Sequence, residues 1–366
     1  MMNKMIVANL AHRPVRSLIS VVAIALEVTL ILLIVGLCLG LLNDSKQRQA
    51  GIGADVIVMP PGSSFIVGLT GSPMSIKIAG VLEKLPHVAV VAPVVQSVST
   101  AGTIEVIAGI DPQTYQQLSG PFHYLQGGPM RSADDCLVDE IYARSRHVKA
   151  GDTVEILNNR FHVAGVIEPG KGARKFLQIG VMQDLIGAQG KATLFYLKLD
   201  NPANAEAVVD EIKKAGMEKY VVSSMAYYLS MMTTNNYPGV SKFIDFVIGI
   251  SVIIGFIVIF QAMYTAVMER TREIGILKSM GASKLYIVNV ILRETVLLAI
   301  GGIIVGIVFS LLARVGIDQR STLRVIVTGG WIAKATGIAI VGAILGALYP
   351  AYQAAQKDPI DALAYE

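Results

Sequence analysis

The chain has 366 residues, of which 53% are hydrophobic and 16% are charged, and its formal net charge is +4. Its mean hydropathy is +0.57, which argues against a water-soluble globular protein and indicates a helical membrane protein. The small positive charge does not gather into the kind of basic patch that binds nucleic acid, so we expect it on surfaces close to the membrane.

Four apolar stretches are long enough to cross a membrane as helices, namely residues 18–42, 243–267, 295–312 and 331–349. A hydrocarbon core of about 30 Å takes roughly 20 helical residues. The first stretch exceeds the roughly 7–15 apolar residues of a cleaved signal peptide and is followed by no A-x-A-like site, so we expect it to remain in the membrane. The predicted fold is an α-helical membrane protein with four transmembrane helices. A large extracytoplasmic α+β domain is inserted between the first helix and the second.

The distribution of Lys and Arg around these stretches predicts the topology, because both residues concentrate on the cytoplasmic side. The residues concerned are Lys4, Arg13 and Arg16 before the first stretch, and Arg270, Arg272, Lys278 and Lys284 between the second and the third. The expected segments are a cytoplasmic amphipathic N-terminus (1–17), an outer domain (43–242), a cytoplasmic elbow (268–294), a short external loop (313–330) and a cytoplasmic tail (350–366). We therefore expect a multi-pass protein of the bacterial cytoplasmic (inner) membrane with both termini in the cytoplasm.

The outer domain is large enough for its own core and has an α+β pattern. Runs of β-branched or alternating residues bounded by turn signals predict strands at residues 55–59, 88–95, 103–110, 153–157, 162–167 and 194–199. Helices are predicted at residues 76–85 and 203–215. We expect two lobes: a first from residues near 50–110 rejoined by 195–235, and a second inserted near 111–194.

The elbow between the second and third apolar stretches is short, charged and punctuated by glycine. Gly275 and Gly281 are expected to break it into short helical pieces, and Ser283 is expected to cap the next helix. A structured polar loop in this place can lie in a cleft of a soluble partner and pass force to the helices on both sides. We therefore predict that the elbow docks on a cytoplasmic partner.

The elbow also carries a specific pattern, E-R-x-x-E-I-G-I-L-[KR]-x-x-G-A-[ST]. The matching residues are Glu269, Arg270, Glu273, Ile274, Gly275, Ile276, Leu277, Lys278, Gly281, Ala282 and Ser283. Together with Arg272, which stands at a variable position of the pattern, they form the predicted docking set. Further matching segments are residues 9–17, 138–152, 163–167 and 350–366. In this pattern, and over essentially its whole length, the chain resembles the permease subunits of MacB/FtsX-type (type VII) ABC transporters.

The resemblance implies a homodimer, or a pair with a related permease, that works with separate cytoplasmic ABC ATPase subunits. ATP and magnesium would bind to those ATPase chains, so we expect neither a cofactor nor enzymatic activity in this chain. In such permeases the outer domain transmits the ATP cycle mechanically. A periplasmic adaptor is a further candidate partner, besides the lipid bilayer.

Glu27 is the least expected residue of the first stretch, since it lies ten residues after Ser17, or about 15 Å into the bilayer by helical rise. An ionisable group near the midplane costs about 2.5–3.5 kcal/mol and usually faces a bundle interior, a polar cavity or a partner. One interpretation is a protonated carboxyl bonded to a neighbouring helix, for example through Tyr264. The other is a role in a substrate or gating cavity.

Small residues at four-residue spacing recur in three of the stretches, as the pairs Gly36/Gly40, Gly302/Gly306 and Gly342/Gly346. Such pairs permit close helix contacts. For Gly36 and Gly40 two interpretations are open, namely packing within one protomer and a dimer seam formed by the first and second spans.

A group of methionines and tyrosines precedes the second apolar stretch. It includes Met225, Tyr227, Tyr228, Met231, Met232 and Tyr237. One interpretation is an interfacial aromatic belt with adaptable apolar packing, and the other is a mouth for a lipophilic substrate.

The remaining motifs indicate no catalytic or metal site. Residues 165–172 (GVIEPGKG) fit the spacing of a phosphate-binding loop, but Gly172 stands where Ser or Thr must bind magnesium and Pro169 favours a plain turn. Cys38 and Cys136 lie in a span and in the outer domain, so we expect no disulfide between them. The five histidines lack the spacing of metal ligands, at positions His12, His87, His123, His147 and His162.

Two function classes remain open. The first is export or extraction of an amphiphilic substrate driven by a partner ATPase, which Glu27 and the methionine–tyrosine group favour. The second is a non-transporting signalling subunit whose outer domain activates an envelope enzyme or another partner.

Overall fold

The computed structural model describes residues 14–63, 72–99, 105–233, 236 and 238–357 of the chain, which divides into two compact units. The helix bundle lies within Met1–Leu39, Gly239–Gly316 and Val325–Glu366, and the inserted domain lies within Gly40–Pro238 and Ile317–Arg324. Most of the expected N-terminal segment and the end of the expected tail fall outside the described residues.

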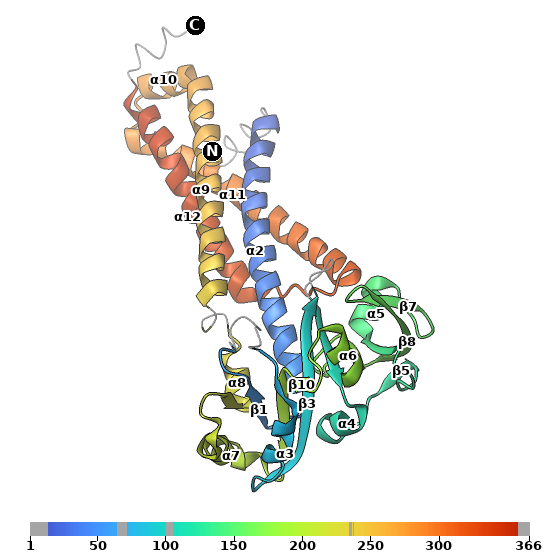
Figure 1. Ribbon diagram of the computed structural model, residues 1–366. Helices are drawn as coiled ribbons and strands as arrows, with labels where there is room; N and C mark the ends of the chain where they lie inside the picture. Colours follow the sequence, from blue (N-terminus) through green and yellow to red (C-terminus); the bar gives the residue numbers. More distant parts are fainter. Residues whose placement is uncertain (1–13, 64–71, 100–104, 234–235, 237, 358–366) are drawn as a thin grey trace. The chain divides into compact units, whose positions relative to one another are not determined.

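Long helices dominate the bundle (Figure 1). They are α2 (Pro14–Ala50), α9 (Pro238–Glu269), α11 (Lys284–Arg320) and α12 (Gly329–Gln356). In the described part of the chain these are the four helices long and apolar enough to cross a membrane. The four predicted spans are therefore confirmed as helices.

Two of these helices extend well beyond the apolar stretches that predicted them. α2 and α11 each have 37 residues, or about 55 Å at about 1.5 Å per residue, against a hydrocarbon core of about 30 Å. The end of an apolar run marks the edge of the bilayer but not the end of the helix. The loop expected at 313–330 is accordingly shorter than predicted, since α11 continues to Arg320 and irregular chain covers only 321–328.

Glycines allow the helices of the bundle to pack closely within one chain. A Cβ added to Gly302 on α11 would lie 2.6 Å from the Cβ of Ile24 on α2, and one added to Gly306 would lie 2.7 Å from the backbone oxygen of Ala25. Next to this contact, Thr29 Oγ1 donates a hydrogen bond to the Gly306 carbonyl at 3.2 Å. α11 therefore lies against α2 at a distance that only small residues permit.

The inserted domain is built on a mixed sheet of ten strands in the order β12-β1-β11-β3-β4-β9-β6-β8-β5, with β7 beside β8. Their bounds are β1 (Val56–Met59), β3 (Val88–Ser99), β4 (Glu105–Ile110), β5 (Tyr124–Gly127), β6 (Asp135–Asp139), β7 (Thr153–Ile156), β8 (Asn159–Ile167), β9 (Lys175–Gln178), β11 (Leu194–Leu199) and β12 (Val221–Ser224). A separate pair is formed by β2 (Met74–Ser75) and β10 (Lys191–Ala192). Neighbouring strands are antiparallel except for the parallel pairs β4–β9 and β6–β8.

Short helices cover the sheet of the inserted domain. They are η1 (Ile76–Ile78), α3 (Ala79–Leu82), α4 (Pro112–Ser119), α5 (Glu140–Arg146), α6 (Ile179–Leu185), η2 (Pro202–Asn204), α7 (Ala205–Ile212), η3 (Lys213–Met217) and α8 (Met225–Met231). β1 is buried on both faces, with Val56 in the core that includes Leu82 of α3 and Ile57 in the core that includes Tyr115 of α4. This is the alternation that a strand covered on both sides requires.

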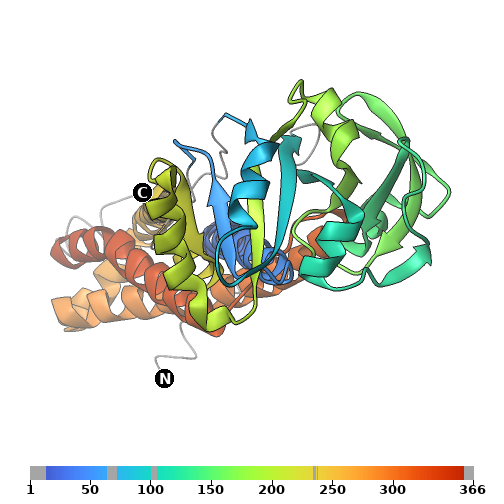
Figure 2. The same ribbon diagram turned by 60° about the horizontal axis from the view of Figure 1, so that its bottom comes forward.

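We call residues 111–194, green in Figures 1 and 2, the second lobe, and the rest of the inserted domain the first lobe. A core around Cys136, Phe161 and Met182 lies mainly in the second lobe and also includes Val95 and Ile107 of the first. The core that includes Ile57 and Tyr115 also includes Phe176 and Tyr196, and so it joins strands of both lobes. β9 belongs to the inserted segment and pairs with β4 of the first lobe, so the sheet runs without a break from one lobe to the other.

Each strand predicted from the sequence is present, with ends shifted by a few residues. The prediction missed β2, β5, β6, β9, β10 and β12, and the helices α4, α5, α6 and α8. These elements are short, and most have no period long enough to be distinguished from a loop.

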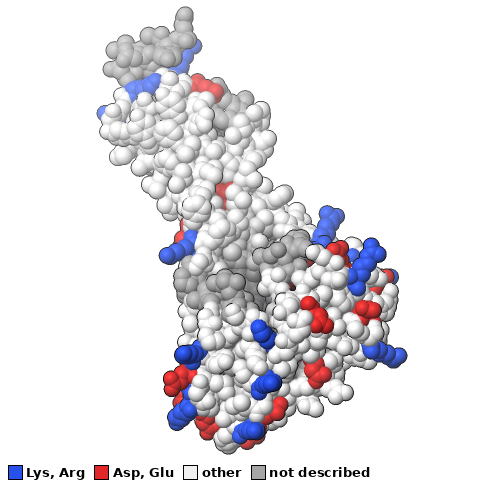
Figure 3. All heavy atoms as spheres, in the orientation of Figure 1, with Lys and Arg blue, Asp and Glu red and all other residues white. Residues whose placement is uncertain are grey.

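The two units differ in surface charge. In Figure 3 the visible surface of the inserted domain carries interspersed charges of both signs, whereas the visible surface of the bundle is mostly uncharged.

Candidate functional site

The elbow between α9 and α11 contains one further helix, α10 (Thr271–Ser279). Gly281 ends it with a left-handed φ of +92°, and the Ala282 N–H donates to the Leu277 carbonyl at 3.0 Å. Ser283 Oγ accepts the Tyr286 N–H at 3.2 Å, so the predicted cap of the next helix is confirmed. Gly275 does not break the helix as predicted: it is buried inside α10, where its lack of a side chain suits a packed face.

Two basic residues of the predicted docking set bind inside the bundle. Arg270 Nη1 lies 2.9 Å from Glu294 Oε2 of α11, in an ion pair whose side chains are only 13% and 5% exposed. Lys278 Nζ donates to the Ala355 carbonyl at 3.0 Å and to the Lys357 carbonyl, where the end of α12 leaves carbonyls without helical partners. Arg270 and Lys278 therefore fix α10 to α11 and α12.

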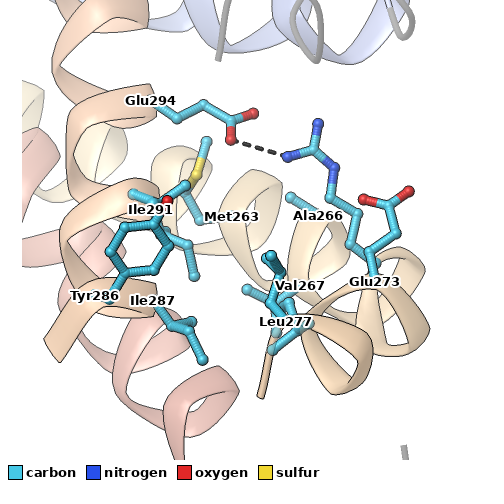
Figure 4. Close-up of a pocket in the computed structure, with 12 residues that line it drawn as sticks. Met263, Ala266, Val267, Glu273, Leu277, Tyr286, Ile287, Ile291 and Glu294 are labelled. Carbon is cyan, nitrogen blue, oxygen red and sulfur yellow. Dashed lines mark hydrogen bonds and ion pairs between the residues drawn. The ribbon is translucent and has the colours of Figure 1, made fainter. Parts of the chain in front are cut away.

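A small cavity of about 60 Å³ lies beneath α10. Its lining is mainly apolar and comes from α9, α10 and α11, with the Arg270–Glu294 pair at its edge (Figure 4). Ile274 and Leu277, both in the predicted docking set, line this cavity and are half-buried. They pack α10 onto the bundle.

The opposite face of α10 is exposed and partly apolar. Ile276 is 44% exposed and Met280 is 71% exposed, and Leu285 at the start of α11 is 79% exposed. Arg272 and Glu273 are also exposed and give this surface a charged edge. We call Ile276, Met280 and Leu285 the elbow tip. Exposed apolar groups with a polar rim are typical of a protein-binding surface.

The sequence analysis did not select Met280 or Leu285. A signal was present, because residues 273, 276 and 280 follow the three- and four-residue spacing of one helix face. The other predicted members divide between exposed positions (Glu269, Gly281, Ser283) and a half-buried one (Ala282).

Glu27 on α2 lies against α9 and α12 and is only 4% exposed. A Cβ added to Gly255 on α9 would lie 2.1 Å from Glu27 Oε2, and one added to Gly342 on α12 would lie 4.0 Å from Glu27 Oε1. Among the described residues neither carboxylate oxygen has a hydrogen-bond partner, so the bond to Tyr264 proposed from the sequence is not made. Tyr264 instead stacks on Phe260.

Most described members of the methionine–tyrosine group pack in a protein core, so for these members both interpretations are wrong. Met225, Tyr228 and Met232 are buried in the core of the inserted domain, and Met231 is half-buried. Tyr227, at 54% exposure, faces outward. α8 has one apolar face that packs on the sheet, a pattern that an interfacial segment shares. Tyr237 falls outside the described residues.

Gly36 packs within one protomer, which supports the first interpretation; a dimer seam formed by the first and second spans stays a prediction. A Cβ added to Gly36 would lie 2.8 Å from Val325 Cγ1 of the same chain, and the Ile326 N–H donates to the Gly36 carbonyl at 2.9 Å. Gly40 is also buried. The space beside Gly36 is therefore already filled by the segment that leads into α12.

The sequence that fits a phosphate-binding loop is a turn between β8 and β9, as predicted. Gly170 and Gly172 adopt φ values of +109° and +92°, and a strand follows instead of a helix. The backbone amides of a helix N-terminus, which a phosphate cradle needs, are missing from this turn.

Comparison with known families decides the classification of the chain. A family model described as a MacB-like periplasmic core domain matches residues 17–215, and one described as an FtsX-like permease C-terminal domain matches residues 246–359. This chain belongs to the MacB/FtsX family of ABC transporter permeases. The family predicted from the elbow pattern is confirmed.

Several known proteins are similar to this family member. An ABC transporter permease of Methanocaldococcus jannaschii is 28% identical over 60% of this chain and 59% of its own length. The macrolide export ATP-binding/permease protein MacB of a Shewanella species is 26% identical over 99% of this chain and 60% of its own length. The solved periplasmic region of MacB from Actinobacillus actinomycetemcomitans matches with a TM-score of 0.39 and 17% identity, over 50% of this chain and 94% of that one. This chain thus spans about 60% of the length of the first two relatives.

Proposed function

We propose that this permease couples ATP hydrolysis by a separate ABC ATPase to movement of the inserted domain, and that this movement drives export or extraction of an amphiphilic substrate. The elbow tip docks on the ATPase in the cytoplasm, which places both termini on the same side and the inserted domain outside. Two permease chains would act together, each with its ATPase. ATP and magnesium would be held by the ATPase chains.

The observation that carries the proposal is the division of α10 into two faces. One face is fixed to α11 and α12 through the Arg270–Glu294 pair and through Lys278, and the other exposes Ile276, with the exposed Met280 directly after the helix. A helix that is held firmly on one side and open on the other can accept a push from a partner and pass it to the bundle. Export rather than signalling is favoured by the MacB relatives, which are macrolide export proteins by name and match 97–99% of this chain.

The elbow tip gives a direct test in nanodiscs that hold this chain and the partner ABC ATPase. Met280→Asp and Ile276→Asp should weaken ATPase binding and stimulation of hydrolysis about tenfold, because a charge in the centre of an interface removes a hot spot of about 1.4 kcal/mol or more. Gly275→Asp is not suitable, since Gly275 is buried and the variant would disturb folding.

The matched control is Tyr227→Asp, which places the same charge on an exposed aromatic position of the inserted domain. It should leave ATPase binding and stimulation unchanged. Normal stimulation by both Met280→Asp and Ile276→Asp would refute docking through the elbow tip. The signalling alternative would be favoured by a different set of results. In that case the ATPase is stimulated normally, no assay detects substrate movement, and an envelope enzyme is activated.

A further inference from the structure

Arg174 ties together three segments of the inserted domain that are far apart in the sequence. Its Nη1 lies 2.9 Å from Asp139 Oδ2, and its Nη2 lies 2.9 Å from Asp44 Oδ2 and 3.0 Å from the Thr322 carbonyl. Arg48 also pairs with Asp44. The cluster is buried, with Asp139 at 1% exposure and Arg174 at 4%.

Each partner of Arg174 belongs to a different element. Asp44 lies in the last turns of α2, Thr322 follows α11, and Asp139 ends β6 and caps α5 by accepting the Tyr142 N–H at 2.7 Å. The backbone of Arg174 is itself fixed to the sheet, since its carbonyl accepts the Asp139 N–H at 2.8 Å. The guanidinium therefore extends from the second lobe to the ends of two long helices.

A second contact presses the same part of the second lobe onto α2. A Cβ added to Gly51, just after α2, would lie 1.9 Å from the Gly170 carbonyl oxygen, and one added to Gly172 would lie 2.9 Å from Ile52 Cδ1. The Lys171 carbonyl accepts the Tyr115 hydroxyl at 2.7 Å. The turn before Arg174 is thus packed directly against the end of the helix.

Because α2 and α11 are continuous helices, the contacts of Arg174, which we call the Arg174 joint, can transmit motion. α2 is one helix from Pro14 to Ala50, and α11 is one helix from Lys284 to Arg320. A displacement of either helix along its axis therefore acts on Asp44 or on Thr322, both of which Arg174 binds. Buried charged hydrogen bonds resist such displacement strongly, because separating them leaves uncompensated charges away from water.

We propose that Arg174 is the positioning residue that makes the second lobe move with α2 and with the Ile317–Arg324 segment. The inference rests on the proposed function, in which motion of the helices must reach the inserted domain. It extends that function by naming the point at which the motion enters. Motion of the helices then enters the inserted domain at the second lobe. The pairing of β4 with β9 passes it on to the first lobe.

A neighbouring ion pair supplies a matched control. Lys175 Nζ lies 2.8 Å from Glu105 Oε2, and the two side chains are 7% and 3% exposed. This pair is as buried as the Arg174 cluster, but it joins β9 to β4 inside the sheet. Loss of Lys175 tests the effect of removing any buried charge, whereas loss of Arg174 also releases α2 and the Ile317–Arg324 segment.

The test measures distances between spin labels in the full-length protein in nanodiscs. One label replaces Lys46 on α2 and the other replaces Glu155 on β7, both exposed positions, in a Cys38→Ser background. The unmodified protein should give one narrow distance distribution. Arg174→Met should broaden this distribution about twofold or more. Arg174→Lys should have a smaller effect, because it keeps the charge and loses only the bidentate geometry. Lys175→Met should leave the distribution narrow. A second pair, at Lys46 and Asp210 of the first lobe, reports whether the domain remains folded.

The outcomes separate this inference from the proposed function. A narrow Lys46–Glu155 distance in Arg174→Met, or equal broadening in Lys175→Met, would overturn the role of Arg174. With the partner ATPase and ATP, Arg174→Met should keep stimulated hydrolysis within about twofold of the unmodified protein and lose the fixed Lys46–Glu155 distance, which is the signature of uncoupling. Normal stimulated hydrolysis in both Met280→Asp and Ile276→Asp would instead overturn docking at the elbow tip, and the label distances would still test the role of Arg174.

Discussion

The carboxylate of Glu27 on α2 lies where a side chain at position 255 of α9 would have to be, since a Cβ added to Gly255 would be 2.1 Å from Glu27 Oε2. Real Cβ atoms do not approach other atoms so closely. The contact between α2 and α9 therefore depends on a glycine at one position and a carboxyl at the other. α12 leaves more room, because a Cβ on Gly342 would lie 4.0 Å from Glu27 Oε1.

Gly255→Ala should destabilise the bundle, and Gly342→Ala should not. The methyl group at position 255 forces the helices apart or Glu27 out of its place, which typically costs about 1–3 kcal/mol. The methyl group at position 342 makes an ordinary contact. Thermal unfolding of the purified variants in detergent measures both effects. Replacing Glu27 with Ala in the Gly255→Ala background should restore part of the loss, and equal stability of the two single variants would contradict the contact.

We propose that Glu27 influences gating through helix packing, since it is enclosed by α9 and α12. Glu27→Gln keeps the shape and should leave thermal stability close to that of the unmodified protein while changing ATP hydrolysis by the partner. Glu27→Leu removes a buried polar group that has no hydrogen-bond partner among the described residues, so it should not lower stability. If both variants transport and hydrolyse normally, Glu27 is a tolerated polar group without a role in gating.

Cys136 should resist thiol reagents until the protein unfolds. Its side chain is 0% exposed, and burial raises the pKa of its thiol to about 12, only partly opposed by the nearby Lys175. The reactive thiolate is therefore almost absent at neutral pH. In a Cys38→Ser variant, maleimide should modify the folded protein very slowly and the SDS-unfolded protein rapidly. Rapid modification before unfolding would place Cys136 outside the core.

His87 and Asp200 should form a pH-dependent pair on the surface of the inserted domain. His87 Nδ1 lies 2.9 Å from Asp200 Oδ2, and this hydrogen bond and charge raise the pKa of His87 above its ordinary 6.5. The pKa of Asp200 is lowered from its ordinary 3.8 by the same hydrogen bond. The attraction is complete between the two pKa values; it fades as pH rises through the raised pKa of His87 and as pH falls through the lowered pKa of Asp200.

Histidine NMR of the labelled protein checks this pair directly. Asp200→Asn should move the titration midpoint of His87 back toward its ordinary value, while the signals of His123 and His147 stay in place. Because both side chains are exposed, the global stability of the protein should change little with the variant. An unchanged His87 midpoint in Asp200→Asn would show that the two side chains do not interact in solution.

Local signals in the sequence were sufficient for several features. The lengths of the apolar runs predicted α2, α9, α11 and α12, because a helix is the structure that satisfies its own backbone in a membrane. Gly281 and Ser283 predicted the turn between α10 and α11, since both act on the backbone within a few residues. The elbow pattern predicted the family.

Other predictions failed because one local pattern fits more than one environment. Met225, Tyr228 and Met232 have the spacing of one apolar helix face, which can meet a membrane interface or a protein core, and the sheet of the inserted domain supplies the core. Gly36 could have faced a second chain, but residues 325 and 326 of the same chain occupy that space.

The sequence by itself determined the spans, the position of the elbow and the family, all of which rest on neighbouring residues and their periodicity. Only the tertiary structure decided which charges meet. Lys278 binds the carbonyl of Ala355 across 77 positions, and Arg174 binds Asp44 across 130 and the carbonyl of Thr322 across 148. No period in the sequence encodes such pairs, because a charged side chain can be satisfied by water or by any opposite charge that folding brings within reach. The position of the elbow was therefore predictable, while the residues that fix it and those that stay exposed depended on the packing of helices distant in sequence.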